Sequence, residues 1–212
     1  NVKTGKPTWS DPLEPMRVAA QVRRMGLSHA VVTSVDRDDL PDYGAGAFVG
    51  VIRSIRMLAP GCKVEILTPD FRGQEMPLAK VVHERPDVFN HNVETVPRLY
   101  PVARRGSQFL RSARVLKMAK EMGGADVVTK SGLMVGLGES FEEMVEAFGI
   151  LREQRVQVLT VGQYLRPTEN HLPVVRYWHP EEFEALEKAA YELGFGSVAS
   201  GPAKSPLPEK SV

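Results

Sequence analysis

Several residue types are scarce in this 212-residue chain, and each shortage excludes a class of protein. The chain contains one cysteine, Cys62, which excludes an internal disulfide and any metal site built from several of its own cysteines. No apolar run approaches the roughly 20 residues needed to span a bilayer, and the opening stretch NVKTGKP has no apolar signal core. The formal net charge is +1, so no overall field favours nucleic acid or a membrane as partner. We therefore expect a cytoplasmic protein.

Six continuous apolar or β-branched runs alternate with amphipathic stretches along the chain. Runs that are apolar on both faces are typical of parallel strands covered by helices. Their alternation with helices predicts right-handed βαβ units and an α/β fold. The expected strands are Ala30–Val35, Val64–Thr68, Val88–Asn92, Val127–Val135, Val156–Gly162 and Ser197–Ser200.

Four helices have recognisable sequence signals. Ser140 and Glu143 form a capping box, in which the hydroxyl accepts from the Glu143 amide and the carboxylate reaches back. The other three are expected from Pro12 to Gly26, from Ser107 to Met122 and from Pro180 to Gly194. In the first of these, Val18, Val22 and Met25 are expected on one face. In the last, the residues expected to point inward are Phe183, Leu186, Ala189 and Leu193.

Nothing in the composition indicates a second domain, and residues 1–201 are predicted to form one. The tail at residues 202–212 carries three prolines and scattered charge, so we expect it to be loose.

Polar residues lie at the ends of five of the predicted strands. The burial of these strands does not by itself explain polar residues at their ends. In parallel α/β barrels the βα loops at these ends carry the chemistry. Five polar strand ends on one rim therefore predict a polar cup that binds a ligand; for any single position, a helix cap or loop residue is the alternative. The polar ends are Thr33–Asp39, Thr68–Arg72, Asn90–Thr95, Lys130–Ser131 with Gly136–Glu139, and Gln163–Thr168.

Lys130 is the most informative of these residues, because an ammonium inside a buried strand is costly unless it is paired. We expect it to meet an anion or a neighbour such as Glu94. His91 and Glu94 are three residues apart and suit either a shared metal or, preferably, hydrogen bonds. Arg104 and Arg105 form a basic pair that suits either a solvated surface or an acidic partner.

Two common nucleotide-binding motifs are incomplete or absent, and the single thiol is explained by packing. Gly136-x-Gly138 lacks the third glycine of a dinucleotide fingerprint, and no Gly-Lys-Ser/Thr phosphate loop occurs. Cys62 opens a predicted strand and is interpreted as a small buried hydrophobe rather than a nucleophile.

Longer blocks are far more specific than these short patterns. They cover the chain from residue 1 to about 202, and together they resemble lipoyl synthases, which are radical S-adenosylmethionine (SAM) enzymes. The opening NVKTGKP is also similar to the segment directly after the cluster-binding cysteines of that family. The blocks are VVTSVDRDDLPD (31–42), EILTPDFRG (65–73), FNHNVETVPRLYP (89–101), LMVGLGES (133–140) and LTVGQYLRPTENHLPV (159–174).

The resemblance implies a partial, open (β/α)6-type TIM barrel whose first strand lies upstream of this chain. It implies a sulfurtransferase that inserts two sulfur atoms into a protein-bound octanoyl chain to make the lipoyl cofactor. The family uses SAM and two [4Fe–4S] clusters, one to cleave SAM into a 5′-deoxyadenosyl radical and one as the sulfur source. Cofactors carry this chemistry, while the protein places and shields the reactants.

The resemblance also assigns roles to individual residues. Thr33 and Ser34 are expected at the SAM amino group, and Asn92 and Glu94 at its ribose and amino group. Lys130 and Ser131 are expected to face the SAM carboxylate. Gln163 and Leu165, with the turn at Gly136–Gly138, are expected to border the adenine. Candidates for the octanoyl-peptide path, with rim ion pairs as the alternative, are Asp36, Arg37, Arg72, Arg105 and Arg166.

The chain departs from the family at its cluster ligands. The family's C-x3-C-x2-C motif ends directly before the position of Asn1, and three further cysteines lie in a more N-terminal segment. The family's C-terminal Arg-Ser-Ser-Tyr motif is replaced here by a tail in which Ser205 stands outside any such motif. Because these clusters need thiolates, the 212 residues by themselves are expected to be inactive and to hold no metal.

The partners that the resemblance implies are octanoylated lipoyl carrier domains, namely the acyltransferase subunit of 2-oxoacid dehydrogenases and the glycine cleavage H protein, with no nucleic acid or membrane. A mitochondrial or plastid location is the alternative to the cytoplasm. Two other functions stay open: a barrel aldolase or lyase with Lys130 as Schiff-base nucleophile, and a non-catalytic remnant that binds SAM or a carrier.

Overall fold

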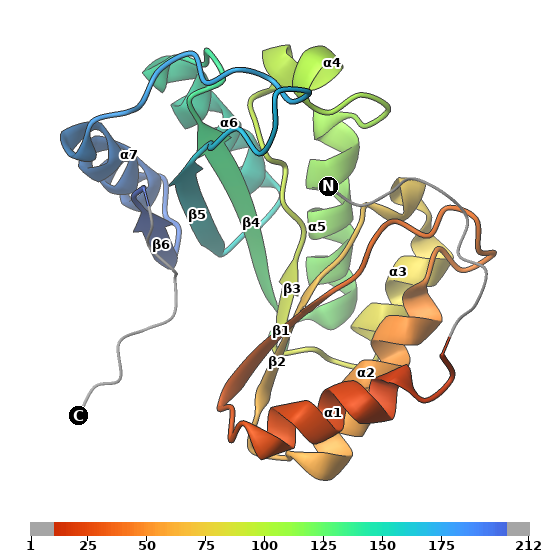
Figure 1. Cartoon of the computed structure of the whole chain (residues 1–212). Helices are drawn as coiled ribbons and strands as arrows, with labels where there is room; N and C mark the ends of the chain where they lie inside the picture. Colours follow the sequence, from red (N-terminus) through yellow and green to blue (C-terminus); the bar gives the residue numbers. More distant parts are fainter. Residues whose placement is uncertain (1–10, 203–212) are drawn as a thin grey trace. The chain divides into compact units, whose positions relative to one another are not determined.

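The computed structural model describes residues 11–202, which form two compact units (Figure 1). The first unit comprises the described residues up to Asn90 together with 118–128, and the second comprises 91–117 and the residues from Thr129 onward. The opening NVKTGKP and the tail beyond Pro202 lie outside the described residues, so the expectation of a loose tail stays a prediction. No helix within residues 11–202 is long and apolar enough to cross a membrane.

The first unit contains three parallel strands in chain order, with the register His29↔Lys63 and Glu65↔Val88. Helix α1 packs against α2, and α2 against α3. The elements are α1 (Glu14–Arg24), β1 (His29–Thr33), α2 (Ala45–Leu58), β2 (Lys63–Leu67), the 3-10 turn η1 (Phe71–Gly73), α3 (Glu75–Val82) and β3 (Val88–Asn90).

The second unit contains the other three strands, again parallel, with the register Lys130↔Val158 and Val158↔Ser197. Helix α5 begins in this unit, and its residues from Met118 on belong to the first. The elements are η2 (Pro97–Leu99), α4 (Tyr100–Ala103), α5 (Phe109–Gly123), β4 (Val128–Val135), α6 (Phe141–Glu153), β5 (Val158–Gln163), α7 (Pro180–Glu192) and β6 (Ser197–Ser200).

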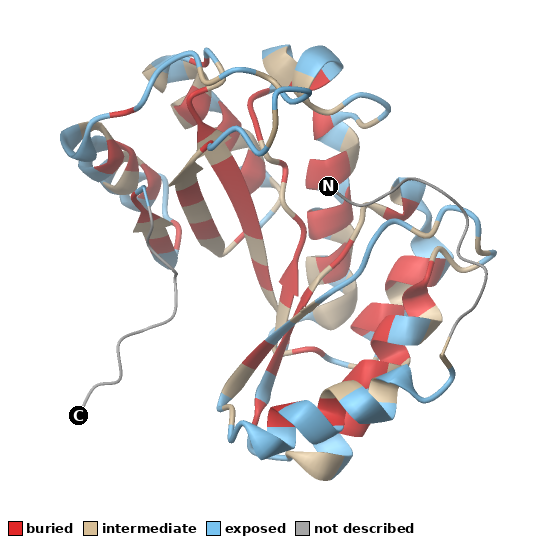
Figure 2. Cartoon of the chain, in the orientation of Figure 1, coloured by how far each residue is buried: buried red, intermediate tan, exposed pale blue. Residues whose placement is uncertain are grey.

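The α/β class with parallel strands joined by helices is therefore confirmed, and all six predicted strands are present among the described residues. Most of β4 is buried, as Figure 2 shows. Thr129, Ser131 and Val135 have no exposed surface, whereas Lys130 and Met134 are half-buried. Lys130 thus lies on the less buried face of its strand, which lowers the desolvation cost of its ammonium.

The capping box at the start of α6 is confirmed, because Ser140 Oγ accepts from the Glu143 amide and the Glu143 carboxylate accepts from the Ser140 amide. The start of α1 was predicted wrongly at Pro12. The Asp11 carboxylate accepts from the Leu13 amide at 2.9 Å and holds a turn there, so the helix begins at Glu14, with Pro15 in its first turn.

Two positions predicted to point inward in α7 were also wrong. Leu193 follows the last residue of the helix and is 38% exposed. Ala190, rather than Ala189, is the buried alanine of α7. Helices α2 and α3 were not predicted. Seven residues of α2 are buried, among them Ile52 and Ile55, and its few polar residues, such as the exposed Arg53 and Arg56, are too sparse in the sequence to mark a solvent face.

Candidate functional site

A cavity of about 760 Å³ lies in the first unit beside the end of β1. Its wall comes from α1, the residues after β1 and α2, and it includes the predicted Thr33, Ser34 and Arg37. Thr33 Oγ1 donates to the Leu67 carbonyl at 3.0 Å, and Ser34 Oγ to the Val35 carbonyl at 3.1 Å. Both side chains are exposed, and each hydroxyl oxygen keeps lone pairs that can accept from a ligand N–H.

The arginines at the same rim take part in ion pairs. Arg37 donates twice to the Asp39 carboxylate, at 2.8 and 2.9 Å, and Arg72 Nε donates to Asp38 at 2.7 Å. These contacts favour the rim ion-pair alternative for both arginines, although exposed pairs of this kind contribute little stability. Asp36, in the same acidic run, is exposed. A role of Asp36, Arg37 and Arg72 on the octanoyl path stays a prediction.

In the second unit, the segment after β3 runs alongside β4 and is hydrogen-bonded to it. The amides of His91 and Glu94 donate to the carbonyls of Lys130 and Gly132 at 3.1 and 3.0 Å, and the Met134 amide donates to the Glu94 carbonyl at 2.8 Å. This pairing brings together four residues predicted to bind SAM on two adjacent backbone segments; they are Asn92, Glu94, Lys130 and Ser131.

Ser131 supports this pairing with its side chain. Its hydroxyl donates to the His91 carbonyl at 2.9 Å and accepts from the Val93 amide at 3.3 Å, and the residue is fully buried. The hydroxyl therefore holds the 91–94 segment in place, and its predicted contact with a SAM carboxylate stays a prediction, as does the pairing of Lys130 with Glu94.

Glu94 is the titratable group with the clearest perturbation at this site. Its burial raises the pKa of the carboxyl, while the charge of Arg104 and a hydrogen bond with Asn92 act in the opposite direction. The residue adopts a φ of 68°, which is uncommon for a residue other than glycine. Such a conformation persists only where the surrounding hydrogen bonds determine it, and here the pairing with β4 does so.

Two side chains of the α4 region fix the backbone around Asn92. Arg104 Nη1 donates to the Asn92 carbonyl at 2.7 Å, and the Tyr100 hydroxyl donates to the Val93 carbonyl at 2.7 Å. The guanidinium of Arg104 lies 5.8 Å from the centre of the Tyr100 ring, within the range of a cation–π contact. The sequence pattern did not identify either anchor as a functional residue, and it marked Arg104 only as half of a basic pair.

Gly132 permits the close approach of three segments. A Cβ at this position would lie 2.6 Å from Thr160 Oγ1 and 2.8 Å from Asn92 Oδ1. A glycine inside a strand often marks such an approach of another backbone or a ligand, so this signal was available in the sequence but was not used.

The turn after β4 is organised by Glu139, a buried carboxylate that is 5% exposed. It accepts from the amides of Gly136 and Leu137. Gly136 and Gly138 have φ values of 111° and 105°, which favour glycine at both positions. The turn beside the predicted adenine position is therefore held from within by a carboxylate.

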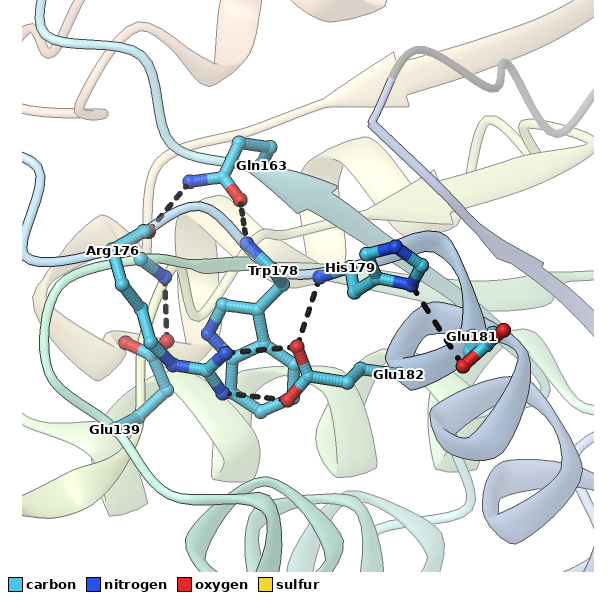
Figure 3. A network of polar contacts seen from close by, with 8 residues as sticks. Glu139, Gln163, Arg176, Trp178, His179, Glu181 and Glu182 are labelled. Atoms are coloured by element: carbon cyan, nitrogen blue, oxygen red, sulfur yellow. Dashed lines mark hydrogen bonds and ion pairs between the residues drawn. The ribbon is translucent and has the colours of Figure 1, made fainter.

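Gln163 ends β5 and connects it to the 175–178 segment (Figure 3). Its Nε2 donates to the carbonyls of Tyr164 and Arg176 at 3.1 and 3.3 Å, and its Oε1 accepts from the Trp178 amide at 3.0 Å. The amide group is thus committed to protein partners. Leu165, two residues further on, is 63% exposed and offers an apolar surface. Contact of either residue with adenine stays a prediction.

Figure 3 also shows how the 175–178 segment joins the start of α7. Arg176 donates twice to Glu182, both at 2.8 Å, and its guanidinium lies 4.1 Å from the centre of the Trp178 ring. Hydrogen bonds from Arg176 and from the His179 amide lower the pKa of Glu182 to about 2. The sequence pattern did not single out any of these residues.

The last two substrate-path candidates lie in loops of the second unit. Arg166 donates to the carbonyls of His171 and Glu169, which closes its own loop. Arg105 comes after α4 and is exposed. Thr33, Ser34, Asp36, Arg37 and Arg72 belong to the first unit, and the other predicted site residues belong to the second.

The donor set of the second unit fits one part of the cofactor set that the resemblance implies. A carboxylate, an amide and an ammonium are groups that could pair with the hydroxyl, amino and carboxylate groups of SAM, and their binding of SAM stays a prediction. The clusters do not fit, because a single cysteine cannot supply their thiolates. Within residues 11–202, no three His, Cys, Asp or Glu side chains are grouped to hold a metal.

Comparison with known proteins identifies the superfamily of this chain. The model of the radical SAM superfamily matches residues 2–151. The FeFe-hydrogenase maturase from Carboxydothermus hydrogenoformans superposes with a TM-score of 0.68 at 14% identity, over 93% of this chain and 47% of that one. The chain therefore belongs to the radical SAM superfamily, and the expected α/β fold of the radical SAM kind is confirmed.

Closer relatives define the branch of the superfamily. The lipoyl synthase of Rubrobacter xylanophilus is 56% identical over 201 residues, which are 95% of this chain and 62% of the relative. That of Pyrobaculum arsenaticum is 54% identical over 206 residues, which are 95% of this chain and 69% of the relative. This chain is a member of the lipoyl synthase family, and it spans roughly two thirds of the length of these relatives.

Proposed function

We propose that the protein to which these 212 residues belong is a lipoyl synthase. It uses SAM and two [4Fe–4S] clusters to insert two sulfur atoms into an octanoyl chain that is attached to a lipoyl carrier domain. The carriers are the acyltransferase subunits of 2-oxoacid dehydrogenases and the glycine cleavage H protein, and the location is the cytoplasm, as suits bacterial and archaeal relatives. The observation that carries the proposal is the pairing of the 91–94 segment with β4, which gathers Glu94, Asn92 and Lys130.

The residues of the second unit would bind and orient SAM. The Glu94 carboxylate accepts from ribose hydroxyls or the amino group, the Asn92 amide lies beside it, and the Lys130 ammonium attracts the methionyl carboxylate. Leu165 offers an apolar surface to the adenine, and Gln163 positions the segment behind it. Bound SAM supplies radical chemistry that acid–base groups cannot provide.

Thr33 and Ser34 of the first unit would accept from the SAM amino group through their free lone pairs. The cluster ligands must come from outside these 212 residues, since the chain has only Cys62, which is buried. The residues of this chain would therefore bind and orient SAM, and none of them is proposed to bind a cluster.

A substitution at Glu94 tests the proposal in the full-length, cluster-reconstituted protein. Equilibrium dialysis with radiolabelled SAM is expected to show at least tenfold weaker binding for Glu94→Gln, because a charge-assisted hydrogen bond is lost. The matched control is Glu184→Gln on the exposed face of α7, which should bind SAM normally. Mass spectrometry of an octanoylated H protein should detect two added sulfur atoms with the wild-type protein.

The outcomes separate the alternatives. SAM binding without sulfur insertion would identify a non-catalytic remnant. Borohydride trapping of a carbonyl substrate on Lys130 would instead identify an aldolase, which the lipoyl synthase relatives do not favour. Normal SAM binding by Glu94→Gln would contradict the assignment of the site.

A further inference from the structure

Positive charge is concentrated in one stretch of the chain. Seven basic residues and no acidic residue occur between Glu94 and Glu121, although the whole chain holds 27 basic and 26 acidic residues. The rest of the chain is therefore acidic on balance. Such a segregation is typical of a surface that binds an acidic partner. The seven are Arg98, Arg104, Arg105, Arg111, Arg114, Lys117 and Lys120.

Some of these basic side chains form ion pairs or hydrogen bonds within the protein, and others are exposed to solvent. Arg98 pairs with Glu143, and Arg104 donates to the Asn92 carbonyl. In contrast, Arg114 and Lys117 are exposed on α5. Leu110 lies four residues before Arg114 on the same helix face and is 69% exposed. The exposed face of α5 thus combines cationic side chains with an apolar one.

The same segment adjoins the candidate SAM site and an apolar pocket. Tyr100 and Arg104 donate directly to the backbone of the 92–93 segment. A pocket of about 160 Å³ opens between this region and the turn after β4; its lining includes Leu99, Val102, Ala103, Leu137 and Val175. Its volume is several times the share of one water molecule, about 30 Å³, and its lining residues are all apolar, so a stretch of hydrocarbon chain fits there.

We propose that residues 98–117, the basic segment, form the docking surface for an acidic protein domain that carries an acyl chain, and that the adjoining apolar pocket receives part of this chain. The inference rests on the proposed function and adds the surface by which the carrier is recognised. Charge complementarity supplies orientation and a fast encounter. Exposed Leu110 and Val102 beside the cations favour a protein over a nucleic acid, because apolar contacts are the core of protein interfaces.

The test measures sulfur insertion by the full-length reconstituted enzyme on two substrates. One is an octanoylated carrier domain chosen for its net negative charge, and the other is a short peptide with an octanoyl-lysine flanked by neutral residues. The variant Arg114→Glu/Lys117→Glu should raise the KM for the carrier at least tenfold at low salt and leave the KM for the peptide unchanged. The control Arg155→Glu/Lys188→Glu changes the net charge equally at exposed positions outside the basic segment and should leave both KM values unchanged.

The two failures are distinguishable. If the wild-type enzyme modifies neither substrate, the proposed function is wrong. If it modifies both, and the Arg114/Lys117 variant keeps its KM for the carrier or loses affinity only for anionic vesicles or single-stranded RNA, the docking surface is wrong. An equal rise in KM for carrier and peptide would also overturn the inference, since it would indicate damage to the site itself.

Discussion

Replacing Gly132 by alanine tests whether the three segments at the candidate site are packed as closely as described. The new Cβ would lie 2.6 Å from Thr160 Oγ1 and 2.8 Å from Asn92 Oδ1, closer than carbon and oxygen approach without displacement. Overpacking of this kind costs about 1–3 kcal/mol. The lower chain entropy of alanine in the unfolded state returns roughly 0.5–1 kcal/mol. With the middle of each range, Gly132→Ala is expected to destabilise by about 1 kcal/mol.

Differential scanning calorimetry measures this effect as a decrease in Tm of roughly 2–4 °C for about 1 kcal/mol in a chain of this size. The matched control is Gly149→Ala in α6, where a Cβ meets no atom within 4 Å; it should stabilise by about 0.5–1 kcal/mol. Adding Asn92→Ala should recover part of the loss, because the two substitutions share one contact. A Gly132→Ala protein with unchanged Tm would refute the close packing.

Three further substitutions test local interactions. Ser140→Ala removes the cap of α6 and should cost about 1 kcal/mol in urea denaturation; an unchanged midpoint would contradict the capping box. Burial raises the pKa of Glu94, so the ionised carboxylate is disfavoured in the folded state. The wild-type protein therefore becomes less stable as pH rises through that pKa. Glu94→Gln should therefore gain stability relative to wild type as pH rises from the ordinary carboxyl range towards neutrality, and a pH-independent difference would argue against the shift. Gln163→Leu leaves the Trp178 amide without its acceptor and should cost about 1–3 kcal/mol, measured by the same denaturation; a neutral result would show that water replaces the contact.

The secondary structure was accessible from the sequence wherever periodicity and end signals agreed. The six strands are apolar runs of the right length, and the Ser140 capping box is a local pattern, since both of its hydrogen bonds lie within four residues. Helix α2 was missed because only Arg53, Ser54 and Arg56 are polar in it, too few to mark a solvent face, and the start of α1 was misplaced because Asp11 forms a turn that competes with the helix. Local signals fail where polar residues are too sparse to mark a face or where a turn competes with the helix.

The sequence alone determined the α/β class, the family and the polar character of the strand ends, because these depend on residue types in order along the chain. Which polar side chains are available to a ligand was decided only by tertiary structure. The hydroxyl of Ser131 and the amide of Gln163 are used by protein partners that lie far away in sequence. The perturbation of Glu94 likewise depends on burial and on Arg104, ten residues further on. Hydrogen bonds and desolvation act through space, so a strand end predicts polarity but not whether its side chains are already satisfied.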